Sequence, residues 1–185
     1  MATNIGVAKG NPKAGGYVFR APIGTVLPTS PTDNLNEAFS EIALISSDGV
    51  VFSRSETDND FRDWAGRIVY SESTERKETA KITYIESIPS VLEEYNGNAT
   101  GNESSFYTDH DGEHPEYVYV IDSIIGDDLL CRTVCPRGKV TSVDDKTHAE
   151  GNLLGYPCNY TFLYDDAAGF TVRDYYAKVT PGGGE

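Results

Sequence analysis

The sequence predicts a mainly β protein, an antiparallel β-sandwich or barrel with one flanking α-helix and long loops or arms. Short runs of alternating apolar and polar residues recur along the chain, Gly, Pro, Asn and Asp separate them, and one segment has clear helical spacing. Such a chain buries its apolar residues between packed sheets or inside a closed sheet, which gives a sandwich or a barrel.

The expected strands follow from this alternation. In the last clear strand, five side chains fall on one face, whereas Pro157 lies on the opposite face and predicts a sheet edge or a bulge. A second segment, 41–52, is expected to turn at Asp48-Gly49, and a third, 68–86, is expected to be a hairpin that turns at Thr74–Lys77. The expected strand segments are 16–22, 41–52, 68–86, 116–125, 129–143, 153–164 and 169–179, and the one-sided set is Tyr156, Cys158, Tyr160, Phe162 and Tyr164.

A helix is expected over residues 87–97. Ser87 is a candidate N-cap, Pro89 suits a first turn, and Asn96-Gly97 is a stop signal. A short helical turn is also expected over residues 32–39, because Asp33 precedes an apolar i,i+4 pair.

The length of 185 residues suits one domain. We expect an N-terminal arm over 1–15, a β domain over 16–179 and a flexible C-terminal tail over 180–185. Segments 53–67 and 97–116 are polar and acidic, and 97–116 is also turn-rich and is expected to be a loop.

The formal net charge of −14, from 29 acids and 15 bases, excludes most nucleic-acid binders, because DNA is a polyanion. We expect neither an export signal nor a membrane span, since no apolar run is long enough. The odd count of three Cys does not imply a disulfide framework, and buried free thiols are expected at Cys131, Cys135 and Cys158.

We expect no catalytic, metal or cofactor site. His110 and His114 have a spacing that aligns metal ligands only on a helix, and Gly112 and Pro115 disfavour a helix, so a solvated acidic loop is the preferred interpretation. Adjacent acids such as Asp127-Asp128 are typical of turns rather than of a glycosidase pair.

Trp64 is the only Trp and lies in a polar segment. It is either a core residue or an anchor at a contact between subunits, and the polar surroundings favour the contact.

The chain resembles the major tail proteins, or tail tube proteins, of long flexible-tailed bacteriophages, in particular phages of Gram-positive bacteria. The resemblance covers roughly residues 15–176. Its most specific parts are the VLP loop (26–28), the DGV turn (48–50), the WAG before a strand (64–66) and the YNG that closes the helix (95–97).

The resemblance implies a non-enzymatic structural subunit without cofactors, located in the virion tail tube and in the host cytoplasm during assembly. Six copies would form a ring, and stacked rings would form a tube that conducts genomic DNA without specific binding. The implied partners are further copies of the chain and the tail tip, tape measure and tail terminator proteins. Segment 48–67 would be a long loop that reaches between rings or subunits, and 68–86 would belong to the sheet that lines the ring.

Two sets of candidate residues follow. The candidates for contacts between subunits are Asp58, Asp60, Phe61, Trp64 and Arg67, and the candidates for acids that line the lumen are Glu72, Glu75, Glu78, Glu86 and Asp122. Two other function classes stay open: a host- or glycan-binding β-sandwich module of a virion, and a glycan hydrolase on a sandwich.

Overall fold

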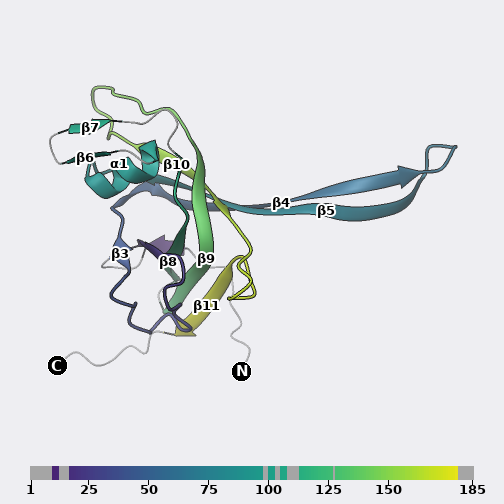
Figure 1. The fold of residues 1–185 in the computed structure, drawn as a ribbon, viewed down its shortest axis with the longest axis horizontal. Helices are drawn as coiled ribbons and strands as arrows, with labels where there is room; N and C mark the ends of the chain where they lie inside the picture. The colour runs from purple at the N-terminus through teal and green to yellow at the C-terminus, as the bar shows by residue number, and fades with distance from the viewer. Residues whose placement is uncertain are drawn as a thin grey trace.

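The structure is a computed structural model that describes residues 10–12, 17–97, 100–102, 105–107, 113–126 and 128–178. It confirms a mainly β, antiparallel fold with one short helix (Figure 1). In chain order the elements are β1 (Gly10–Pro12), β2 (Val18–Pro22), β3 (Ser40–Glu41), β4 (Ile45–Arg62), β5 (Ile68–Tyr84), α1 (Pro89–Asn96), β6 (Thr100–Asn102), β7 (Ser105–Tyr107), β8 (Tyr117–Ile125), β9 (Leu129–Val143), β10 (Tyr156–Phe162) and β11 (Arg173–Lys178).

The main sheet is curled so that its two ends meet. Its strand order is β3-β2-β8-β9-β10-β5-β4, with β1 added beside β8 and β11 beside β9. The end strands β3 and β4 are consecutive in the chain, and the short link between them bonds to both sides. Ile42 N–H donates to Val18 O (3.0 Å), and Leu44 O accepts from Ile85 N–H (3.1 Å). The curl therefore approaches a closed barrel, which protects most strand edges of the body.

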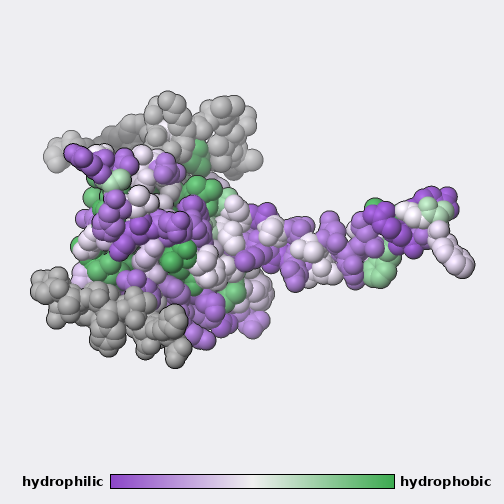
Figure 2. Space-filling model, turned by 90° about the horizontal axis from the view of Figure 1, so that it is seen from above, coloured by the Kyte–Doolittle hydropathy of each residue, from purple (hydrophilic) through white to green (hydrophobic). Residues whose placement is uncertain are grey.

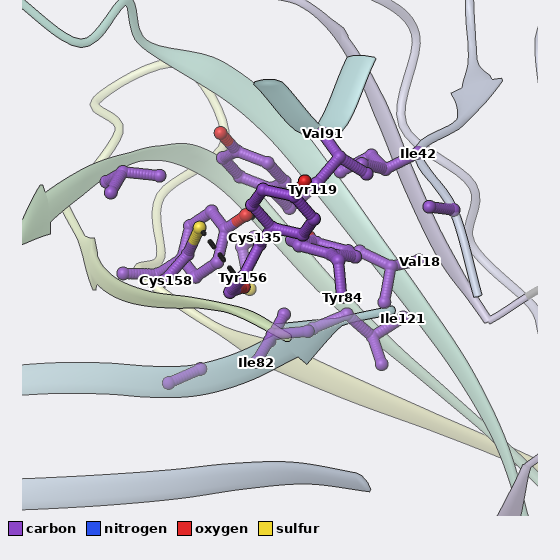
Figure 3. Packing of buried hydrophobic residues seen from close by; sticks show 14 of the residues in the cluster. Val18, Ile42, Ile82, Tyr84, Val91, Tyr119, Ile121, Cys135, Tyr156 and Cys158 are labelled. Atoms are coloured by element: carbon purple, nitrogen blue, oxygen red, sulfur yellow. Dashed lines mark hydrogen bonds between the residues drawn. The ribbon is translucent and has the colours of Figure 1, made fainter. Parts of the chain in front are cut away.

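The core lies inside this curl, under α1. The predicted one-sided set on β10 is largely confirmed, because Tyr156, Cys158, Tyr160 and Phe162 are all buried whereas Tyr164 is exposed. Figure 3 shows Tyr156 and Cys158 in the same cluster as Val18, Tyr84 and Tyr119, with Val91 of α1 above Tyr119.

Of the two alternatives for Pro157, the sheet edge is wrong, because β10 lies between β5 and β9, whereas an irregularity in the pairing of β10 with β9 lies nearby, between Asn159 and Tyr160. Pro157 O accepts from Asp144 N–H (3.1 Å), one residue beyond the end of β9. In an extended strand the N and O atoms of one residue point to the same side, so the nitrogen of Pro157 also faces the chain just beyond the end of β9. Its missing N–H therefore removes no hydrogen bond from the pairing between β9 and β10.

The expected turns at Asp48-Gly49 and Thr74–Lys77 are both wrong. Strand β4 continues through the first, where residues 46–49 form an irregularity between the pairs Ile45↔Tyr84 and Val50↔Ile82, with Gly49 at φ 71°. Strand β5 runs through the second, because this charged stretch pairs with β4. The chain instead reverses at Asp63–Arg67, so segment 48–67 is a strand and a turn rather than a loop.

Helix α1 confirms the predicted helix, but its N-cap is Ile88 and not Ser87. Ser87 Oγ forms a hydrogen bond with Tyr156 Oη (2.8 Å) instead, which ties the helix start to β10. The expected helical turn over 32–39 is absent from the structure, where Asp33 Oδ2 accepts from Thr29 N–H (2.9 Å) behind it rather than capping the residues ahead.

Two expected irregular segments contain strands. Residues 10–12 of the predicted arm pair with β8 as β1, and the predicted loop 97–116 contains the two-stranded sheet β6-β7. Residues 1–9, 13–16 and 179–185, which include the predicted C-terminal tail, and His110 with its acidic neighbours lie outside the described residues.

The three cysteines are buried free thiols, as predicted. Burial raises the pKa of all three thiols, most strongly at Cys135 and Cys158, and the thiolate is the reactive form. We therefore expect almost no reaction of the folded protein with a thiol reagent at pH 8, and three reacted thiols in denaturant, as measured by thiol titration. Rapid modification of Cys135 or Cys158 under native conditions would contradict the described packing.

Candidate functional site: a projecting arm

Strands β4 and β5 extend together far beyond the body (Figure 1). Strand β5 pairs with β10 only over Glu78–Tyr84, and β4 is the last strand of the sheet. Residues 53–77 are therefore a two-stranded ribbon, which we call the arm. At the rise of a β-strand it is about 30 Å long.

The arm is solvated on both faces. Every residue of 53–77 is exposed apart from the partly buried Asp63. Its cross-strand ion pair Arg76–Glu56 is of the exposed kind that contributes little to stability. A lone two-stranded hairpin is at best marginally stable in water, and packing against another surface would stabilise it.

The arm ends in a tight turn organised by Asp63. Its Oδ1 accepts from the N–H groups of Ala65 and Arg67 (both 2.9 Å), and its Oδ2 accepts from Arg67 Nε (2.8 Å). The hydrogen bonds from the backbone and then the side chain of Arg67 lower the pKa of Asp63. Gly66 has a φ of 80°, which a side chain would strain.

Apolar side chains gather around this turn, which we call the tip (residues 60–70). Phe61, Ile68, Val69 and Tyr70 are about half exposed, and Trp64 is fully exposed (105%). Figure 2 shows separate apolar spots near the end of an otherwise polar arm. The alternative that Trp64 is a core residue is therefore excluded. Isolated exposed apolar residues are ordinary, but a cluster of this kind typically marks an interaction site.

The five predicted contact residues come together on the outer arm. Asp58, Asp60 and Phe61 lie on β4, and Trp64 and Arg67 lie in the turn. The sequence indicated Trp64 through its polar surroundings. It gave no sign of Ile68, Val69 and Tyr70 as exposed residues, because a run of consecutive apolar residues is the usual signal of a buried strand.

The five predicted lumen acids do not form one surface. Glu72 and Glu75 are exposed on the arm, Glu78 pairs with Arg54 at its base, and Glu86 accepts from Leu44 N–H (2.7 Å) near the body.

The prediction that Asp122 lines the lumen is wrong, because this residue is only 4% exposed. Its carboxylate accepts from Arg132 Nε (2.7 Å) and Nη2 (2.8 Å), directly opposite on β9. Arg132 also donates to Ser30 O (3.1 Å) and Asp33 O (2.8 Å), so the pair anchors the loop after β2. Asp122 is a structural residue in this chain.

A second buried charge was missed by sequence reasoning. Glu94 of α1 is 3% exposed, and its Oε1 accepts from Arg20 Nη1 (2.7 Å). Its Oε2 accepts from the hydroxyls of Tyr119 and Tyr160 (both 3.1 Å). Burial raises the pKa of Glu94, whereas the charge of Arg20 lowers it. This network fixes α1 to β2, β8 and β10.

In the described part of the chain, no three His, Cys, Asp or Glu side chains come together as a metal site. No helix there is long and apolar enough to cross a membrane.

The structure is thus a curled antiparallel sheet that carries one long exposed ribbon. The family model described as phage tail tube protein matches residues 13–176, and the chain belongs to this family. It is a structural, non-enzymatic subunit of a phage tail tube in the virion. Among solved structures, a chain of the "Virion of native gene transfer agent (GTA) particle" is similar at 14% identity with a TM-score of 0.36, over 80% of this chain and 92% of that chain. A search among curated proteins found no significant match.

Proposed function

We propose that the arm is the element through which copies of this tube subunit hold one another. The observation that supports this proposal is the combination of a ribbon exposed on both faces and a cluster of apolar side chains at its end. Covering such a ribbon with a neighbouring copy removes apolar surface from water and protects its free strand edges.

In this proposal six copies form a ring, and stacked rings form the hollow tube that conducts genomic DNA from the capsid to the host cell. Further copies, the tail tip, the tape measure and the tail terminator proteins are the partners. A long flexible tail and a Gram-positive host complete the proposal, and they rest on the sequence resemblance alone.

The net charge of −14 suits a DNA conduit, because a negative wall avoids the phosphate contacts that give non-specific affinity. We propose that Glu72, Glu75 and Glu86 present charge to the lumen, while Glu78 belongs to the base of the arm. The alternative of a host- or glycan-binding module lacks a specific observation in its favour.

The single Trp gives a direct test of the arm. Trp64 is fully exposed in the isolated chain, so its fluorescence should shift to the blue, and its quenching by acrylamide should fall, as tubes form. Assembly is followed in parallel by electron microscopy, and Trp64→Phe, which lacks the signal, is the control. Unchanged emission in tubes that are visible by microscopy would show that the tip is not a contact. Failure to form tubes at any concentration, even with tail-tip components, would contradict self-assembly through the arm.

A further inference from the structure

A groove lies at the base of the arm, where it leaves the body. It consists of two adjoining cavities of about 410 Å³ and 570 Å³ that share Phe52, Ser123 and Thr133. Both volumes lie within the range of ordinary binding pockets, about 300–1,000 Å³. The smaller cavity is also lined by Cys131, by the acids Glu78 and Asp174 and by one base, Arg54, so its wall is part apolar and carries more acids than bases.

One acceptor in this groove is unsatisfied. Arg54 binds Oε1 of Glu78, whereas Oε2 of Glu78 is buried and has no hydrogen-bond partner among the described residues. A buried carboxylate oxygen without a donor costs free energy comparable to a lost charged hydrogen bond. An occupant that brings an N–H donor, above all a cation, would remove this cost.

The tip carries the complementary chemistry. It combines five exposed apolar side chains with two arginines, and its two acids and two bases make it neutral on a chain of net charge −14. The Arg67 side chain is 79% exposed and the Arg62 side chain is 56% exposed. The tip can therefore approach an acidic groove without the like-charge repulsion that other parts of this chain would meet.

The tip cannot fill the groove of its own chain. Trp64 is twelve residues from Phe52 along an extended ribbon, which corresponds to about 40 Å, and the ribbon points away from the body (Figure 1). A tip that occupies this groove must therefore come from another molecule.

We propose that the tip of one copy docks in the groove of the next copy, with Trp64 against Phe52 and Cys131 and with Arg67 donating to Glu78 Oε2. This rests on the proposed role of the arm in assembly and adds the surface that receives it. The contact joins two different patches, so it is head-to-tail and repeats from copy to copy, as rings and filaments require.

A mixing experiment tests the pairing of the two surfaces. Trp64→Asp prevents the tip from binding but leaves the groove intact, and Ser123→Trp fills the groove but leaves the tip intact. Each variant alone should stay monomeric, and their mixture should form a 1:1 complex by analytical ultracentrifugation, because one intact tip and one intact groove remain. Phe52→Glu replaces Ser123→Trp if thermal melting shows that the latter is unfolded. A mixture that stays monomeric, or a Ser123→Trp protein that assembles like wild type, would overturn the proposal.

Photo-crosslinking locates the receiving surface. A benzophenone side chain at position 64 should crosslink, in assembled tubes, to peptides that contain residues 52–54, 123 or 131–133 of another copy. Glu78→Gln should weaken association at least tenfold, whereas Glu150→Gln, which lies in the exposed segment between β9 and β10, away from the arm and the groove, should leave it unchanged. Crosslinks to another surface, or to residues 1–9 or 179–185, would overturn the proposal that the groove receives the tip. If the arm still proves necessary for tubes, the proposed function survives that result, and tubes that form without the arm would overturn both.

Discussion

Replacing Glu94 by Ala is expected to lower the free energy of unfolding by about 3–5 kcal/mol, because it breaks a buried ion pair and leaves its partners without an acceptor. The guanidinium of Arg20 and the hydroxyls of Tyr119 and Tyr160 all donate to this carboxylate. Urea denaturation of the unassembled protein measures the loss, and α1 should separate from the sheet first.

The matched control is Glu93→Ala. Glu93 also binds Arg20 (2.5 Å), but its side chain is 44% exposed, so its loss should cost about 0–1 kcal/mol. If both substitutions lower the free energy of unfolding equally, the burial of Glu94 is not the reason for its contribution to stability.

The same residue predicts a pH dependence. A carboxyl group whose pKa is raised on folding adds stability below its unfolded pKa, near 4.5, and that contribution is lost as the pH rises through the folded pKa. The stability of the wild type relative to Glu94→Gln should therefore increase as the pH falls from 7 to 5. A difference that shrinks over this range would mean that Arg20 outweighs the burial.

The fold class could be predicted because alternation in the body strands is set by burial. Tyr156, Cys158, Tyr160 and Phe162 alternate since one face of β10 is in the core. The arm could not be predicted in the same way. Its residues face water on both sides, so no alternation is imposed, and charged stretches such as residues 74–77 resemble turns although they pair with β4.

The buried charges could not be predicted from the sequence either. Asp122 and Glu94 have ordinary acidic positions in the sequence, and only the register of β8 with β9 and the approach of α1 to β2 reveal their arginine partners. The exposure of Trp64 was indicated by its polar neighbours, whereas its place at the end of a long ribbon depends on where β4 and β5 reverse.

Removing the arm is expected to abolish tube formation and leave the body folded. Arg54 and Glu78 lie directly opposite each other, so residues 55–77 can be replaced by Asn-Gly, which closes a two-residue hairpin at this pair. The deleted residues are exposed apart from Asp63, which is partly buried, so the core of the body loses no packing.

The melting temperature of the shortened protein should stay close to that of the wild type, while microscopy should show no tubes. A milder variant, Trp64→Lys, keeps the ribbon and should reduce assembly without changing the melting temperature, since an interface Trp can contribute a few kcal/mol. A large drop in melting temperature for the shortened protein would show that the arm supports the body. Normal tubes from the shortened protein would mean that copies hold one another through the body alone, and the exposed apolar tip would then need a partner outside the tube.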